Sequence, residues 1–189
     1  CAFGADALRA NTTASDNNAF GLGALDENTT GTRNNAFGTN ALGAPRTTND
    51  STAFGHNALL LDTGGSNSAF GSLAGDAISS GTGNCAFGLN ALGAQTTALN
   101  ASAFGTSALL LNTAADNCAF GANSLDANTS GVRNSAFGAS ALSGIVTGTD
   151  CTAFGHNALL GASGIQNSAF GSRAGDAISI GVDNAAFGS

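Results

Sequence analysis

The stretch Asn-Cys-Ala-Phe-Gly-Leu-Asn-Ala-Leu, residues 84–92, decides the fold, because variants of it recur from one end of the chain to the other. All 12 phenylalanines stand in an Ala-Phe-Gly tripeptide, at a nearly constant interval such as that from Phe20 to Phe37 or from Phe54 to Phe70. A short, fixed period indicates a repeat architecture in which equivalent residues form columns. We number the columns from the residue before Ala-Phe-Gly, so that Cys85 is in column 1 and Phe87 in column 3.

The repeat is too short for a helical solenoid, whose units exceed about 30 residues because each needs two helices and a turn. A Gly follows every Phe, which would cost a helix about 1 kcal/mol each time but suits a corner with positive φ. The pattern therefore predicts an all-β fold, a β-solenoid or β-roll with coils of 16–17 residues and about eleven coils. Each coil would hold two short strands, and strand spacing gives a rod roughly 50 Å long.

The two large apolar columns are expected to fill the interior as ladders. Column 3 is always Phe and column 8 is mostly Leu, whereas column 2 is Ala in every repeat and would face outward. An outward column restricted to Ala suggests contact with another chain. The predicted core-ladder residues are Phe20, Phe37, Phe54, Phe70, Phe87, Phe104, Phe120, Phe137, Phe154, Phe170, Leu25, Leu42, Leu59, Leu92, Leu109, Leu125, Leu142 and Leu159.

Column 8 has two exceptions. Gly75 and Gly175 replace Leu there, and Ile78 and Ile178 lie three residues further on. These isoleucines are expected to fill the volume that the missing Leu leaves.

A longer period lies over the short one. Asp26, Asp76, Asp126 and Asp176 share column 9, at a constant interval of three repeats. A coil as long as this interval would place these carboxylates next to one another at strand spacing, where like charges repel. The short coil separates them by three coils, so electrostatics favours it.

Composition limits the classes of partner. The net charge is −7, and all five basic residues are Arg, so the basic stripe of a nucleic-acid-binding protein is missing. No apolar run approaches the ~20 residues of a membrane span. We expect residues 1–189 to form one continuous repeat domain, either a segment of a longer chain or a unit that stacks end to end.

The reactive residues do not gather into a catalytic, cofactor or metal site. Cys1, Cys85 and Cys118 share column 1 but never in adjacent coils. Cys85 and Cys118 would lie roughly 10 Å apart, beyond the reach of a disulfide. They are expected to be small buried residues or to bridge chains across a symmetry axis. His56 and His156 are about six coils apart and cannot act together, and we expect both at the surface.

Three polar columns raise binding hypotheses. The Asp residues of column 9 could hold Ca²⁺ at a coil corner, although the Gly/Asp nonapeptide pattern is absent. Column 12 is mostly Thr or Ser, which predicts either a hydrogen-bonded ladder or a surface that binds ice. Asn11, Asn28 and Asn128, in column 11, begin Asn-x-Ser/Thr sequons and are candidate glycosylation sites.

Two phrases recur in the repeats: Asn-Ser-Ala-Phe-Gly at 67–71, 134–138 and 167–171, and Thr-Ala-Phe-Gly-His-Asn-Ala-Leu at 52–59 and 152–159. These phrases resemble two related repeat types. One is the head repeat of YadA-like trimeric autotransporter adhesins, and the other is the Asn-Thr-Ala-Ile-Gly-x-x-Ala-Leu repeat of phage tail-fibre-like and bacterial surface proteins. The resemblance implies a homotrimer of rolls lying side by side, and a single-roll filament stays open.

These observations predict a non-enzymatic structural segment of an extracellular fibre, stalk or adhesin. It would lie outside the cell or on a cell or virion surface and assemble with itself, as a homotrimer or an end-to-end filament. The alternative is a module that binds ice, glycan or a host surface through a Thr/Ser/Asn face. No cofactor, nucleic-acid partner or membrane span is expected.

Overall fold

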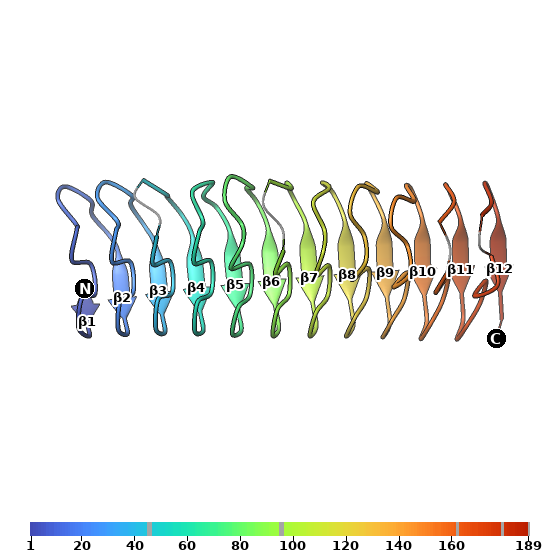
Figure 1. Cartoon of the computed structure of the whole chain (residues 1–189), viewed down its shortest axis with the longest axis horizontal. Helices are drawn as coiled ribbons and strands as arrows, with labels where there is room; N and C mark the ends of the chain where they lie inside the picture. Colours follow the sequence, from blue (N-terminus) through green and yellow to red (C-terminus); the bar gives the residue numbers. More distant parts are fainter. Residues whose placement is uncertain (45–46, 95–96, 162, 179, 189) are drawn as a thin grey trace.

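The structure, a computed structural model, describes residues 1–44, 47–94, 97–161, 163–178 and 180–188. The described chain winds into a solenoid whose coils lie side by side in one row, with the two termini at opposite ends (Figure 1). The predicted all-β solenoid with one repeat per coil is confirmed, because each strand pairs with the strands one coil before and one coil after it.

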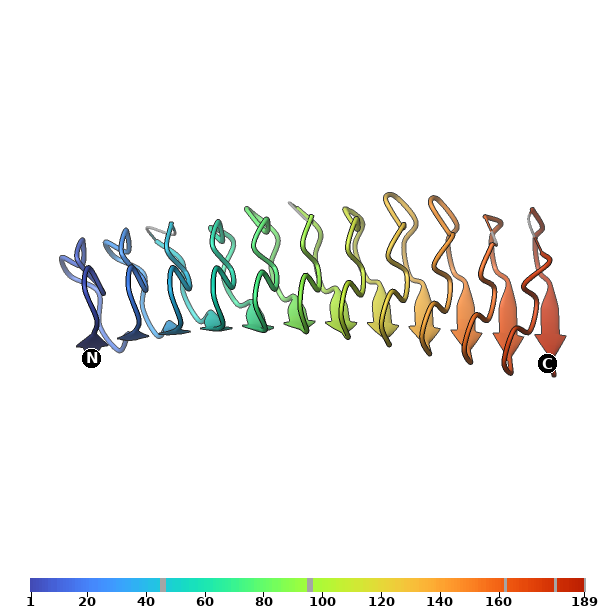
Figure 2. The ribbon, with the colours of Figure 1, turned by 60° about the horizontal axis from the view of Figure 1, so that its bottom comes forward.

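One short strand comes from each coil, and all of them end at Phe. The strands are β1 (Ala2–Phe3), β2 (Asn18–Phe20), β3 (Asn35–Phe37), β4 (Thr52–Phe54), β5 (Ser68–Phe70), β6 (Cys85–Phe87), β7 (Ser102–Phe104), β8 (Cys118–Phe120), β9 (Ser135–Phe137), β10 (Thr152–Phe154), β11 (Ser168–Phe170) and β12 (Ala185–Phe187). Within the described residues they form one parallel sheet in sequence order, which Figure 2 shows along one side of the rod.

The prediction of two strands per coil is wrong for the described residues, because the chain after Phe keeps turning. In the second coil φ is 140° at Gly21, 64° at Gly23 and 52° at Leu25. Alternate residues in the left-handed region cannot form an extended strand. The turns are nevertheless bonded between coils, as when Leu25 N–H donates to the Ala41 carbonyl at 3.1 Å.

The strand register is the same after long and short coils. Phe37 pairs with Phe54 across a long coil, and Phe54 pairs with Phe70 across a coil that is one residue shorter. In the short coil Thr63 of column 12 still bonds Ser79 of column 12 in the next coil, its N–H donating to the Ser79 carbonyl at 2.6 Å. The residue that this coil lacks is therefore missing between column 12 and the next strand, and the sheet is continuous.

The Gly that follows Phe is required on two grounds. At Gly88 φ is +134°, and a Cβ atom added there would lie 2.6 Å from the Gly105 carbonyl. An L-residue with a side chain rarely adopts this φ, and the neighbouring coil leaves no space for a methyl group. This explains why column 4 is Gly in every repeat.

The Leu ladder is confirmed as the centre of the core. Leu25, Leu42 and Leu92, like the other described Leu residues of column 8 beyond the first coil, are 0% exposed. Their φ values near +50° are unusual for Leu. Gly75 occupies the same column with φ +61°, and the buried Ile78 side chain lies where a Gly75 side chain would be, with its Cδ1 2.9 Å from the added Cβ. The expected filling by Ile78 is thus confirmed.

Candidate interaction surface

The Phe ladder lies on the outside of the sheet, so the predicted inward orientation of Phe is wrong. Ala19, Ala36 and the other column 2 alanines of β2 to β11 are 0–1% exposed. Because successive strand residues face opposite sides, the Phe and column 1 residues that flank Ala face outward, and they are partly exposed. We call this outer side, made of columns 1 and 3 on β1 to β12, the Phe face. The outward Phe residues include Phe20, Phe37, Phe54, Phe70, Phe87, Phe104, Phe120, Phe137, Phe154 and Phe170.

Ala faces inward and Phe faces outward because the roll is narrow. The interior already holds the Leu side chains, the Ala residues of column 7 and a row of Asn side chains. Only a methyl group fits between the strand and these residues, which restricts column 2 to Ala. The same restriction removes the suggestion that column 2 contacts another chain.

The Phe rings stack on one another along the whole sheet. From Phe20 to Phe187, neighbouring ring centroids are 4.3–5.4 Å apart and the ring planes differ by 3–12°. Each ring face between the terminal coils is therefore covered by the next ring, and the ring edges point to solvent. The result is a continuous apolar ridge that offers no free aromatic face between its ends.

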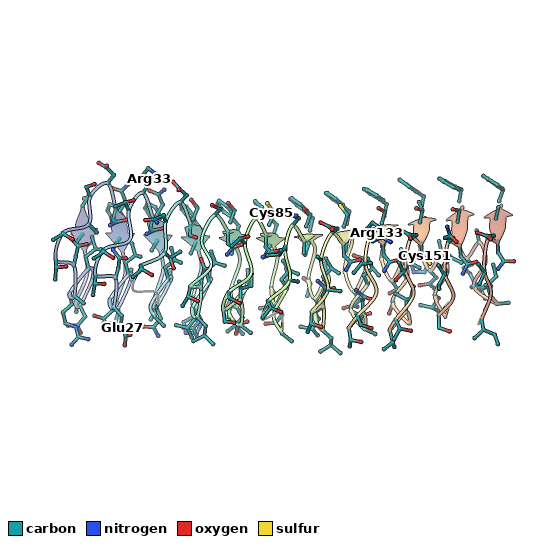
Figure 3. All side chains as sticks on the ribbon, turned by 90° about the horizontal axis from the view of Figure 1, so that it is seen from above. Glu27, Arg33, Cys85, Arg133 and Cys151 are labelled. Carbon is teal, nitrogen blue, oxygen red and sulfur yellow. The ribbon has the colours of Figure 1, made fainter. Side chains whose placement is uncertain are left out.

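Beside the Phe column, column 1 of the Phe face holds small and mostly polar residues, and charged residues border it. Column 1 is Asn, Ser, Thr, Cys or Ala, and the Asn18 amide donates to the Asn35 side-chain oxygen at 2.8 Å. Just before the strands, Arg33 pairs with Asp50 at 2.6 and 2.7 Å. Figure 3 labels Arg33 and Cys85 on the strand side of the rod, opposite Glu27.

A buried ladder of Asn side chains connects each coil to the next. Its members are Asn17, Asn34, Asn67, Asn84, Asn117, Asn134 and Asn167. The Asn84 amide donates to the Ala98 carbonyl of its own coil at 3.0 Å, and its side-chain oxygen accepts from the Ala101 N–H of the next coil at 2.9 Å. Ala101 is 0% exposed, so its backbone N–H would be buried without this partner if Asn84 were absent. Sequence reasoning noted the recurrent Asn but missed this role.

The Asn ladder is interrupted at the longer period. Ser51, Ala101 and Cys151 replace Asn in the coils that are one residue shorter. In the first of these coils the Ser51 hydroxyl accepts from the Asn67 N–H at 3.4 Å and donates to the buried Asp62 carboxylate at 2.8 Å, and this carboxylate also accepts from the Asn67 amide at 2.9 Å. Asn112 has the equivalent position in the next short coil, and it accepts from the Asn117 amide at 3.1 Å.

Burial raises the pKa of the Asp62 carboxyl, and hydrogen bonds from Ser51, Gly65, Asn67 and Gly64 oppose this shift. An acid whose folded pKa is raised binds its proton more tightly in the folded state. It therefore adds stability below its unfolded pKa of about 3.9, and this stability is lost as pH rises through the folded pKa.

Asp62→Asn is expected to remove the loss of stability that accompanies rising pH, because Asn has no carboxyl group to ionise. The column that contains Asp62 accepts Asn, since Asn112 occupies the equivalent position. The melting temperature of the variant minus that of the wild type should grow as pH rises from about 3 to about 7. Thermal unfolding followed by circular dichroism measures the difference. Asp116→Asn at an exposed position is the control, and a pH-independent difference for Asp62→Asn would contradict the expectation.

The Thr column forms the predicted hydrogen-bonded ladder. The Thr12 hydroxyl donates to the Thr29 carbonyl at 3.0 Å, and the Thr63 hydroxyl donates to the Ser79 carbonyl at 2.6 Å. The same bond joins Thr113 to Thr129 at 2.6 Å. These hydroxyl protons bond the next coil and are not directed at an external ligand.

The candidate glycosylation sites divide into two kinds. Asn28 and Asn128 are 0% exposed, and their amides donate to the Gly31 and Gly131 carbonyls at 3.0 and 2.9 Å. A glycan on either amide nitrogen does not fit the folded coil, so these two predictions are wrong for the folded chain. Asn11 is exposed, and glycosylation there stays a prediction.

The remaining candidates stay dispersed. His56 and His156 are exposed corner residues, as expected, and the cysteines are free, with Cys151 buried. Among the described residues, no three His, Cys, Asp or Glu side chains gather as metal ligands, and no pocket is present. Two column 9 aspartates pair with Arg: Asp26 with Arg9 and Asp176 with Arg173.

No helix in the described ranges has the length and apolar character needed to cross a bilayer. Comparison with protein-family models, curated proteins and solved structures found no match to this chain.

Proposed function

We propose that this chain is a non-enzymatic, mechanically stiff segment of an extracellular fibre, stalk or adhesin that assembles with itself at a cell or virion surface. The observation that carries the proposal is the unbroken parallel sheet from β1 to β12, which runs along the rod. Bending or stretching the rod requires breaking sheet hydrogen bonds between neighbouring coils, because each coil contacts mainly its neighbours.

Three further ladders support the proposal, since each adds links between neighbouring coils along most of the rod. The Leu ladder fills the core, the Asn ladder satisfies buried backbone groups, and the Phe rings stack outside. Equivalent residues are thus repeated along the length of the molecule, which suits a structural rod. The resemblance of the repeats to adhesin heads and fibre proteins favours the surface location.

Electron microscopy combined with limited proteolysis tests the stiffness. The purified chain is expected to form straight rods of about 50 Å per copy, and thermolysin should leave the repeat region uncut under conditions that digest an unfolded control. Flexible particles or cleavage at every coil would contradict the proposal. Antibodies against the folded chain test the location, and labelling of source cells only after permeabilisation would exclude a surface fibre.

A further inference from the structure

We infer that the Phe face is the interface of a parallel homodimer, in which two rods lie sheet against sheet with their N-termini at the same end. This inference rests on the proposed function as a self-assembling rod. It adds the surface through which the chain assembles, the number of chains and their relative direction.

The first argument is the size of the apolar ridge. Phe54, Phe154 and Phe170 are 38–40% exposed, which is about 80 Å² each for a side chain of roughly 200 Å². On the same conversion, the six most exposed rings alone, those of Phe3, Phe54, Phe120, Phe154, Phe170 and Phe187, expose on the order of 600 Å² of apolar area. A typical monomer reaches this value only in its largest patch, which is often functional. With the half-exposed column 1 beside it, the Phe face approaches the roughly 800 Å² that each partner buries in a stable complex.

The second argument is the distribution of charge. Columns 1 and 3 contain no charged residue in any repeat, whereas paired charges such as Arg33–Asp50 and Arg133–Asp150 border the strands. An aromatic centre without charges inside a polar rim is the composition of a protein–protein interface. Both ion pairs can stay hydrated at the rim when the centre is covered.

The third argument identifies the partner. Because the faces of the inner rings are covered by neighbouring rings, the ridge offers only apolar edges and cannot stack on sugar rings. From Phe20 to Phe187 it repeats every 4.3–5.4 Å between ring centroids. A surface with the same repeat and the same shape exists on a second copy of this chain, so a copy can contact successive coils in register.

The fourth argument fixes the direction. The Phe face has a tall column of Phe beside a short column of Ser, Thr, Cys or Asn. A two-fold axis parallel to the rod, between these columns, places each Phe of one copy over column 1 of the other. Large residues then pack against small ones, as close-packed layers require. An antiparallel pair would place Phe over Phe and leave a gap over column 1.

The ridge variant tests the interface. Phe70, Phe87 and Phe104 are changed together to Thr, a residue of high β propensity, and mass is measured by sedimentation velocity. The wild type is expected at twice the chain mass of 18.2 kDa, and the variant at the mass of one chain with an unchanged far-ultraviolet spectrum. The control is Leu61→Thr with Leu111→Thr, two residues that are each 47% exposed in the column of Glu27, on the opposite edge; it should remain dimeric.

A second variant covers the case in which the triple change unfolds the chain. Ser102→Lys adds one charge at the outward column 1 of β7, where it does not enter the core, and should also give folded monomers. A monomeric wild type, or variants that remain dimeric, would overturn the inference.

The direction is tested with a chain whose only cysteine is at position 168, made by Ser168→Cys with the four native cysteines changed to Ser. A short thiol-to-thiol cross-linker should join the two copies in the parallel dimer. Dimers that do not cross-link would overturn the parallel arrangement, since antiparallel copies hold these positions on the order of 40 Å apart. Straight, protease-resistant monomers would overturn the dimer and leave the stiff-segment function standing, whereas dimers that retain no rod shape would contradict that function.

Discussion

Gly88→Ala is expected to destabilise the chain by about 3–5 kcal/mol, the sum of an unfavourable φ and a steric overlap. The added Cβ would lie 2.6 Å from both the carbon and the oxygen of the Gly105 carbonyl. The Phe87–Gly88 segment cannot move away without breaking the bond from the Gly88 N–H to the Phe70 carbonyl, 2.8 Å long. Chemical denaturation of the variant and the wild type measures the difference.

Gly161→Ala is the matched control, because the nearest atom to its added Cβ, the Asp176 carbonyl oxygen, is 3.8 Å away. The control should change stability by less than about 0.5 kcal/mol, as for other surface substitutions. Equal effects of the two changes would show that the close approach of neighbouring coils at column 4 does not limit the residue type.

Asn84→Ala is expected to cost about 2–4 kcal/mol, because the buried Ala101 N–H loses its partner and the Ala98 carbonyl loses one hydrogen bond. The Ala98 carbonyl loses a bond of 3.0 Å, and the Ala101 N–H loses one of 2.9 Å. The site is shielded from solvent, since Asn84 is 1% exposed. The same denaturation experiment gives the free energy of unfolding, and hydrogen exchange at the Ala101 amide should accelerate.

Asn35→Ser provides the control for the Asn ladder. Asn35 is one residue beyond the ladder column, on the Phe face, and column 1 already contains Ser in β5 and β7. The change removes one partly buried side-chain bond with Asn18, so a loss of about 1 kcal/mol or less is expected. A small effect of Asn84→Ala, similar to that of the control, would show that the ladder is not needed for stability.

The sequence shows which polar residues recur in the interior, but it does not show which hydrogen bonds they make. The Asn before column 1 recurs, yet an isolated Asn suggests a turn or surface as readily as a buried bridge. The replacement of Asn by Ser51, Ala101 and Cys151 in the short coils is visible in the sequence. The hydrogen bonds made at these positions cannot be predicted from the sequence. They involve Asp62 and Asn112, which approach the Asn column only when the coil closes.

The sequence by itself determined the coil length, the parallel stacking and the Leu ladder. A strict period leaves no other way to bring equivalent residues together, and Gly in column 4 of every repeat indicates a corner. The sequence also contained a sign of the true interior, because a column restricted to Ala in every repeat indicates steric confinement.

Only the tertiary structure decided which side of the strand faces the core. Ala and Phe alternate on every strand, so the strand pattern allows either side to be inside. The choice depends on the width of the roll, which is set by the positive φ values at Gly21, Gly23 and Leu25 together with the volume of the Leu and Asn side chains. In this narrow interior a methyl group fits and a phenyl ring does not, so the rings stack outside and form the Phe face.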